Sequence, residues 1–233
     1  MITFGHLDID FDDRVLEPRQ WTVRQARWAA ELLEGLPAGP VLELCAGAGQ
    51  IGLLTVALSP RRLVCVDASP VAGRFIEENA RRAGLEELLE VRVADVQHAV
   101  GPEETFALVI ADPPWVRSDE VNGFPEDPAE AIDGGEDGLA VALQCVRVIE
   151  EHLLPGGQAL IQLGDLHQAE ALGRALAGSR LTVGEVVEVE GRGVLVQLTG
   201  GPRGRDGSGG GAVARSAPGR VPRTGLSGVS GPG

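Results

Sequence analysis

The segment Val41-Leu42-Glu43-Leu44-Cys45-Ala46-Gly47-Ala48-Gly49 is the part of the sequence from which the architecture is most readily recognised. Its first four residues form an apolar run of the kind found in strands that are buried on both faces. Gly47 and Gly49 follow, and they allow the backbone to approach a ligand closely. A helical segment begins directly afterwards. A strand, a glycine turn and a helix in this order predict a nucleotide-binding unit of an α/β sheet.

Apolar runs and helical segments alternate along most of the chain, and this alternation at short spacing is typical of a doubly wound sheet. We therefore predict an α/β fold: a mostly parallel seven-stranded sheet of Rossmann-like type with helices on both faces, whose last two strands form an antiparallel edge. The expected strands are 41–44, 63–66, 89–93, 108–110, 158–163, 183–189 and 194–198, and the expected helices are 22–36, 51–57, 70–83, 138–153 and 168–177.

The 233 residues divide into three expected parts. Residues 1–20 form an N-terminal extension that contains a small hairpin over 4–16, and residues 21–199 form the α/β domain. Residues 200–233 are rich in Gly, Arg and Pro and poor in large apolar side chains. Such a composition buries too little surface to offset chain entropy, so we expect this tail to be disordered.

Charge and cysteine content exclude several classes of protein. The formal net charge is −14, and the tail holds five Arg and one Asp, so the body before it carries −18. A body this acidic repels phosphate backbones and disfavours nucleic acid as the main partner. The three cysteines are odd in number and widely spaced, which excludes a disulfide framework and indicates a reducing compartment. No apolar run is long enough for a membrane span and no secretory signal is visible, so a cytoplasmic location is expected.

Two acidic residues accompany the glycine turn. Asp67 ends the expected strand 63–66, and a carboxylate at the end of the second strand accepts hydrogen bonds from ribose hydroxyls. Its alternative role is that of a helix N-cap. Glu43 lies within the first strand, where an acid suits a ligand amine. Gly47, Gly49 and Gly52 also fit the G-x-G-x-x-G pattern of a nicotinamide site. We favour S-adenosylmethionine, which has no phosphate and carries an ammonium and a sulfonium.

Asp112-Pro113-Pro114-Trp115 is the most specific motif of the sequence, and it follows the apolar strand 108–110. Two successive prolines lack backbone donors and hold the chain extended, while their carbonyls stay free to accept hydrogen bonds. Asp112 and the Pro113 carbonyl can therefore bind the two hydrogens of a planar NH₂ group, and Trp115 can stack on its face. The alternative interpretation is a capped strand end with a core tryptophan.

This motif resembles the Asn/Asp-Pro-Pro-aromatic signature of amino-methyltransferases. Together with the glycine turn and Asp67, the chain resembles class I S-adenosylmethionine-dependent methyltransferases, and most closely the HemK-like protein-glutamine methyltransferases (methyltransferase small domain). Residues 16–22 are similar to that family's Leu-Ile-Pro-Arg-Pro-Glu-Thr, and residues 127–139 to its Glu-Pro…Ala-Leu…Gly-Gly-x-Asp-Gly-Leu.

The resemblance implies a site. Its catalytic residues are Asp112, Pro113 and Trp115, and no metal is expected. S-adenosylmethionine is expected to be bound by Arg19, Thr22, Glu43, Ala46, Gly47, Gly49, Asp67, Ala68, Asp95 and Asp112. The alternative role of Asp95 is that of a cap at the end of its strand.

Three features depart from the HemK-like pattern: Cys45 stands where the family has Gly, Asp112 and Trp115 replace Asn and Tyr, and no counterpart of the helical N-terminal domain of the bacterial release-factor enzymes is expected in these 233 residues. The resemblance implies N-methylation of a planar NH₂ acceptor, with a protein glutamine amide as the first choice. An RNA or DNA base, a small molecule, a nicotinamide oxidoreductase and a nonenzymatic binding domain remain as alternatives.

Overall fold

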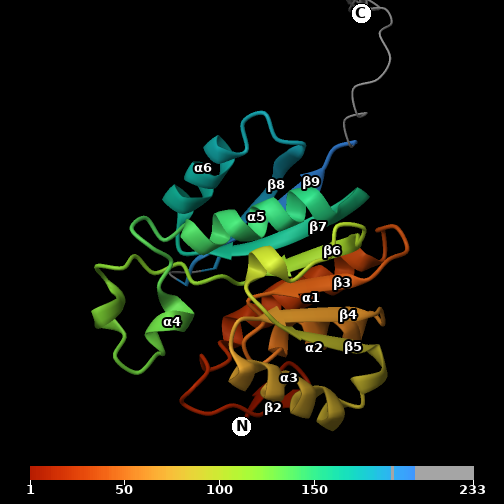
Figure 1. Ribbon diagram of the computed structural model, residues 1–233, viewed down its shortest axis with the longest axis vertical. Coiled ribbons are helices and arrows are strands. Elements are labelled where there is room, and N and C mark those ends of the chain that lie inside the picture. Colours follow the sequence, from red (N-terminus) through yellow and green to blue (C-terminus); the bar gives the residue numbers. More distant parts are fainter. Residues whose placement is uncertain (190–191, 203–233) are drawn as a thin grey trace, which may run out of the picture. The chain divides into compact units, whose positions relative to one another are not determined.

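The computed structural model describes residues 1–189 and 192–202 (Figure 1). The expected tail over 200–233 therefore falls outside the described residues from residue 203 onward. The strands are β1 (Ile2–Phe4), β2 (Leu7–Ile9), β3 (Val41–Leu44), β4 (Leu63–Asp67), β5 (Leu89–Val93), β6 (Phe106–Ala111), β7 (Leu153–Leu163), β8 (Leu181–Glu188) and β9 (Val194–Gly200). The helices are α1 (Val23–Leu33), α2 (Gln50–Leu58), α3 (Pro70–Ala83), α4 (Ala129–Ile132), α5 (Ala140–His152) and α6 (Leu166–Ala175), and short 3-10 turns lie at η1 (Gln20–Thr22), η2 (Glu86–Leu88), η3 (Val96–His98) and η4 (Val121–Gly123).

The main sheet has seven strands in the order β5-β4-β3-β6-β7-β9-β8. The pairs β5-β4, β4-β3, β3-β6 and β6-β7 are parallel, whereas β7-β9 and β9-β8 are antiparallel. A separate two-stranded sheet is formed by β1 and β2. The predicted mostly parallel seven-stranded sheet with an antiparallel edge is confirmed.

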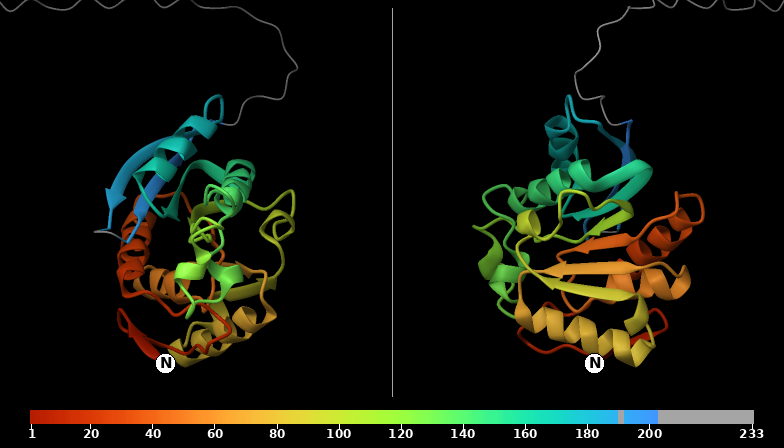
Figure 2. Two further views of the ribbon diagram at one scale, coloured as in Figure 1. Left: turned by 90° about the vertical axis from the view of Figure 1, so that its left-hand side faces the viewer. Right: turned by 45° about the vertical axis from the view of Figure 1, so that its right-hand side comes forward.

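Helices cover both faces of this sheet (Figures 1 and 2). Side chains of the central strands alternate between the faces: Val41 joins a core with α1, α2 and α3, whereas Leu42 joins a core with α5 and α6. The same alternation places Leu108 in the first core and Val109 in the second. Because both faces are covered, the central strands are apolar throughout, which explains their continuous hydrophobic runs.

The strand order indicates at which edge of the sheet a ligand would bind. The chain runs outward from β3 through β4 to β5, then returns to place β6 on the other side of β3. This reversal between β3 and β6 is a topological switch point, and ligands of open α/β sheets bind at the carboxyl ends of strands beside such a point. The loops that follow β3, β4 and β6 therefore meet at one edge, and they carry the glycine turn, Asp67 and the Asp-Pro-Pro-Trp motif.

Some element boundaries differ from the expected ones. The expected strand 158–163 begins earlier, at Leu153, because Phe106 pairs with Leu153 and Leu108 then pairs with Gln158, which leaves an irregularity around Gly156. The N-terminal hairpin is shorter than the expected 4–16, and its buried Phe4 packs into the core with α1, α2 and α3. None of the helices in residues 1–189 and 192–202 has the length and apolar character needed to cross a bilayer.

Candidate active site

The turn between β3 and α2 has left-handed backbone at three positions. Gly47 and Gly49 have φ of 54° and 80°, and Cys45 has φ of 58°. A Cβ at Gly49 would also lie 3.1 Å from Cγ1 of Ile76 in α3, a tight contact that Ile76 would have to relieve by a small shift. A non-glycine residue in this conformation carries steric strain from its side chain, and Cys45 is the only such residue with positive φ among those that the structure describes. Its sulfur lies 4.0 Å from that of Cys145 in α5.

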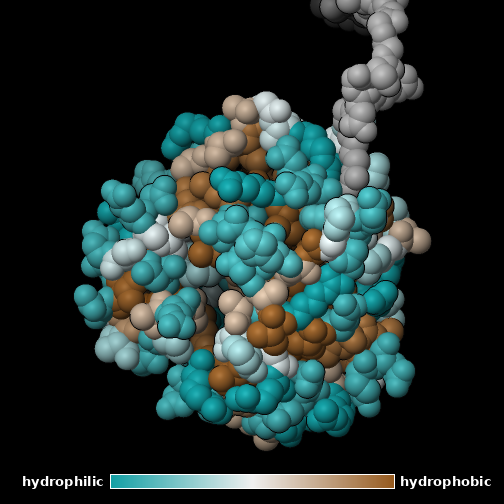
Figure 3. Space-filling view, in the orientation of Figure 1, coloured by the Kyte–Doolittle hydropathy of each residue, from teal (hydrophilic) through white to brown (hydrophobic). Residues whose placement is uncertain are grey.

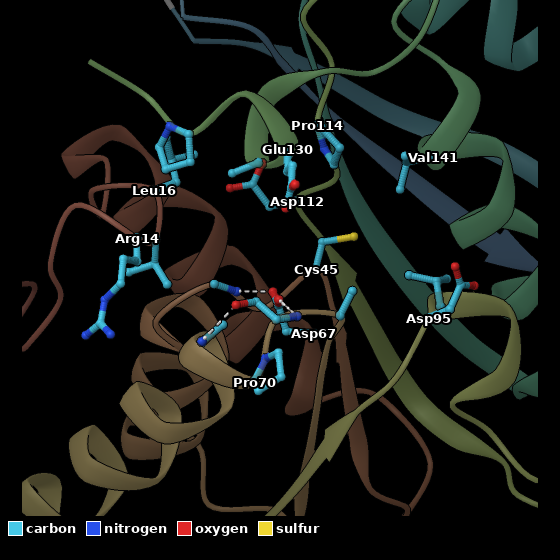
Figure 4. A pocket seen from close by; sticks show the side chains of 18 of the residues that line it. Arg14, Leu16, Cys45, Asp67, Pro70, Asp95, Asp112, Pro114, Glu130 and Val141 are labelled. Atoms are coloured by element: carbon cyan, nitrogen blue, oxygen red, sulfur yellow. Dashed lines mark hydrogen bonds between the residues drawn. The ribbon is translucent and has the colours of Figure 1, made fainter. Parts of the chain in front are cut away.

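Asp67 ties this turn to the end of β4. Its Oδ2 accepts a hydrogen bond from the Gly47 N–H at 2.8 Å, and its Oδ1 accepts one from the Ser69 N–H at 2.9 Å (Figure 4). Burial raises the pKa of the Asp67 carboxyl, and the two N–H donors partly offset that rise. The cap of α3 is provided by Ser69, whose hydroxyl accepts from the N–H of Val71. The N-cap of α3 is therefore Ser69, and the alternative role of Asp67 as the helix cap is not observed.

A cavity of about 450 Å³ opens at the carboxyl edge of the strands. Gly47, Asp67, Ala68, Asp95 and Asp112, all expected from sequence to bind the cofactor, line it. Figure 3 shows a hollow left of centre on this face, and in Figure 4 Cys45 lies between Asp67 and Asp112. The Asp95 side chain is 57% exposed, and its Oδ1 accepts from the Gln97 N–H at 2.9 Å.

Three other expected cofactor residues lie behind the cavity lining, namely Glu43, Ala46 and Gly49. Glu43 is 2% exposed, its Oε1 accepts from the Gly52 N–H at 2.9 Å, and its Oε2 accepts from the Cys65 thiol at 3.1 Å. Burial raises the pKa of Glu43 to about 7. The Ala46 carbonyl accepts from the Gly49 N–H at 2.8 Å. These residues shape the turn from beneath. Glu43 does not line the cavity, and its expected contact with a ligand amine stays a prediction.

Asp112 follows β6 at the switch point. Burial raises the pKa of its carboxyl to about 7. The carbonyl of the preceding residue, Ala111, accepts from the side-chain amide of Gln25 at 3.1 Å, which fixes the end of the strand. Asp112 and Pro114 line the first cavity and also a second one of about 270 Å³. The carboxylate therefore stands at the junction of two adjoining cavities.

The second cavity contains the rest of the Asp-Pro-Pro-Trp motif. Pro113 and Trp115 line it, together with Arg19 and Thr22. Arg19 forms an ion pair with Asp127, whose side chain is only 8% exposed. The Thr22 hydroxyl donates to the Arg19 carbonyl at 2.8 Å. Arg19 and Thr22, expected from the resemblance to bind the cofactor, thus lie in the second cavity and do not line the first.

Sequence reasoning missed several lining residues. Gln50 and Glu130 line the first cavity, and Trp21, Phe124 and Arg192 line the second. The Arg192 guanidinium lies 4.7 Å from the centroid of the Trp21 ring. Gln50 directly follows the glycine turn and could have been suspected from that position. Trp21 and Glu130 lie within the motif-like stretches 16–22 and 127–139, although neither residue was singled out. Phe124 and Arg192 come from segments without a local motif, and only the fold brings them to the cavity.

Comparisons with known proteins find similar methyltransferases. The family model "Methyltransferase small domain" matches residues 27–124. A "Release factor glutamine methyltransferase" of Thermodesulfovibrio yellowstonii is 31% identical over 194 residues, 79% of this chain and 68% of that protein. Another of the same name, from Koribacter versatilis, is 33% identical over 156 residues, 64% of this chain and 55% of that protein.

The chain thus spans about half to two thirds of the length of these curated relatives. Among solved structures, a ribosomal protein L11 methylase from Lactobacillus delbrueckii subsp. bulgaricus superimposes with a TM-score of 0.61 at 16% identity, covering 81% of this chain and 82% of that one. This likeness shows the fold alone. The sequence match to the first relative, over two thirds of its length, shows the family as well: the chain belongs to the class I S-adenosylmethionine-dependent methyltransferases, in the HemK-like family.

Proposed function

We propose that this chain transfers a methyl group from S-adenosylmethionine to the side-chain amide of a glutamine in a protein. The observation that carries the proposal is the place of Asp112 between two adjoining cavities. A methyl transfer needs a donor and an acceptor that meet at one point. The first cavity offers the donor side and the second the acceptor side.

The residues of the first cavity fit S-adenosylmethionine. Asp67 presents a carboxylate at the end of β4, where ribose hydroxyls can donate to it. Gly47 lacks a side chain where the backbone borders the cavity, and a Cβ there would lie 4.0 Å from Gln50 Oε1. The Oε1 of Gln50, within the described part of the chain, is buried without a hydrogen-bond partner, so this cavity wall has an unused acceptor. When bound, S-adenosylmethionine supplies an electrophilic methyl group on its sulfonium.

The second cavity suits a planar amide. Asp112 and the Pro113 carbonyl can accept hydrogen bonds from its two N–H groups, and Trp115 can cover its flat face. An amide nitrogen is a poor nucleophile because its lone pair is delocalised. The two acceptors fix the direction of the nitrogen and increase its electron density. Their hydrogen bonds strengthen as positive charge develops on nitrogen, so they favour the transition state over the ground state.

A nucleobase amine is the second candidate acceptor. Asp112 and Trp115 favour it, since the sequence has Asp and Trp where the glutamine enzymes have Asn and Tyr, and Trp21 adds another aromatic ring to the cavity. The formal net charge of −18 for the body before the tail opposes it, because phosphates would be repelled. The names of the curated relatives also favour glutamine.

Asp112→Ala tests the proposal. The variant should bind S-adenosylmethionine in calorimetry with nearly unchanged affinity, and its turnover on lysate protein should fall by about a hundredfold, the scale of one lost preorganised electrostatic partner. Asp112→Asn separates the two acceptors: it restores the family's own residue and should keep substantial activity on a glutamine amide, but little on a nucleobase that relies on full negative charge. Wild-type turnover in Asp112→Ala would contradict the mechanism.

A further inference from the structure

Gln168 lies outside both cavities, yet its side chain is bonded to the segment that forms the second one. It stands in the first turn of α6 and is 9% exposed. Its backbone N–H donates to the Asp165 carboxylate at 2.8 Å, which caps the helix and fixes where the side chain starts. The Gln168 side chain then extends away from α6 toward the Asp-Pro-Pro-Trp motif.

The amide of Gln168 joins three separate segments. Its Oε1 accepts from the Gly164 N–H at 2.7 Å, beyond the end of β7. Its Nε2 donates to the Trp115 carbonyl at 2.9 Å and to the Asp137 carbonyl at 3.1 Å. Both amide hydrogens therefore meet carbonyls and the amide oxygen meets an N–H, so the partners fix the orientation of the amide.

Two glycines make this arrangement possible. A Cβ at Gly138 would lie 2.2 Å from Gln168 Nε2 and 2.3 Å from the Trp115 carbonyl oxygen. A Cβ at Gly164 would lie 2.6 Å from Cε3 of the Trp115 ring. The ring of Trp115 thus packs directly on the backbone at Gly164 while it lines the second cavity. Backbone, ring and amide are held at distances that leave no space for an added methyl group.

We propose that Gln168 is a positioning residue that holds Trp115 in place as a boundary of the acceptor cavity. The proposal rests on the function proposed above, because it assigns the second cavity to the methyl acceptor. Without the amide, the Trp115 and Asp137 carbonyls and the Gly164 N–H lose a buried partner together. Trp115 is then free to shift, and a small misplacement of a positioning group lowers the rate steeply. Gln168 does not line the first cavity, so cofactor affinity should not depend on it.

Tryptophan fluorescence tests the placement directly. The chain has three tryptophans, and Trp21→Phe with Trp28→Phe leaves Trp115 as the sole reporter. Adding Gln168→Met, which keeps the length and removes the polar groups, should increase quenching of Trp115 by acrylamide. Gln168→Glu keeps an acceptor for the Gly164 N–H and loses both donors, so it should also increase the quenching of Trp115. This variant replaces Gln168→Met in the experiment if Gln168→Met does not fold. Gln197→Met is the matched control, since it removes another part-buried amide, bonded to Gln158 at 2.6 Å, and should leave quenching unchanged.

Kinetics of the full chain test the consequence. With the protein fraction of a nuclease-treated lysate as acceptor, Gln168→Met should lower kcat/KM by about tenfold or more, mainly through the apparent KM for protein. The Kd for S-adenosylmethionine should stay within about twofold of wild type, and combination with Trp115→Ala should add less than the product of the single effects.

Unchanged acrylamide quenching of Trp115 would overturn the proposal, and so would raised quenching with unchanged kcat/KM. A loss of kcat/KM in Gln197→Met equal to that in Gln168→Met would overturn it as well. The quenching experiment needs no methyl acceptor, so it remains decisive for the position of Trp115 even if wild-type protein methylates no glutamine, a result that would count against the proposed function alone.

Discussion

Asp112→Asn should stabilise the protein, and the gain should grow with pH. Burial raises the pKa of Asp112 from 3.8 to about 7, so folding favours its protonated form. The contribution of protonated Asp112 to the free energy of unfolding is fully present below the unfolded pKa of the group. It is lost as pH rises through the folded pKa. Asparagine is neutral throughout and keeps the same size. The asparagine variant therefore avoids a loss that the native carboxylate suffers between about pH 4 and pH 7.

The size of the effect follows from the pKa shift. A shift of roughly three units corresponds to about 4 kcal/mol at full ionisation. Between pH 5 and pH 8, the free energy of unfolding of Asp112→Asn relative to wild type should rise by roughly 2–3 kcal/mol. Urea unfolding followed by circular dichroism at the two pH values measures it. Asp95→Asn is the control, because that side chain is 57% exposed and its substitution should show no such growth. An equal difference at both pH values would refute the burial argument for Asp112.

Three further outcomes are expected. Asp67→Ala should weaken S-adenosylmethionine binding in calorimetry by about 1.5–3 kcal/mol, the scale of lost charge-assisted hydrogen bonds, and unchanged affinity would remove Asp67 from the site. The kcat of wild type should rise with pH through about 7 as Asp112 ionises, and Asp112→Asn should flatten that profile; a profile that keeps its shape in the variant would exclude Asp112 as its source. Cys45→Gly should raise the free energy of unfolding by about 1 kcal/mol in urea titration, because glycine adopts φ of 58° without strain, and a loss of stability would show that contacts of the cysteine outweigh it.

The fold and the centre of the site were predictable because their signals are local. The glycine turn lies after one strand and Asp67 at the end of the next, and parallel strands end at a common edge of the sheet, so their order along the chain predicts that they meet. Asp112 was predictable for the same reason. The continuous apolar runs that marked the strands arise because each central strand packs against helices on both faces.

The remaining features depend on contacts that no local pattern encodes. Glu43 points beneath the turn because strand alternation places its carboxylate beside the Gly52 N–H and the Cys65 thiol, and the sequence alone did not reveal which side the ligand would take. Arg192 reaches Trp21 only because the β8–β9 hairpin lies near the N-terminal segment. Gln168 is separated by 53 residues from Trp115, and nothing in its own neighbourhood marks it as a partner.

Identification of the methyl acceptor tests the central claim most directly. Wild-type protein and Asp112→Ala would each be incubated with a cell lysate and S-adenosylmethionine that carries a radioactive methyl group, and the products would be digested separately with protease and with nuclease. Our account predicts wild-type-dependent label that protease releases and nuclease does not, recovered as N-methylated glutamine by mass spectrometry, with little label from Asp112→Ala. Label that only nuclease releases, or equal labelling by both proteins, would contradict it.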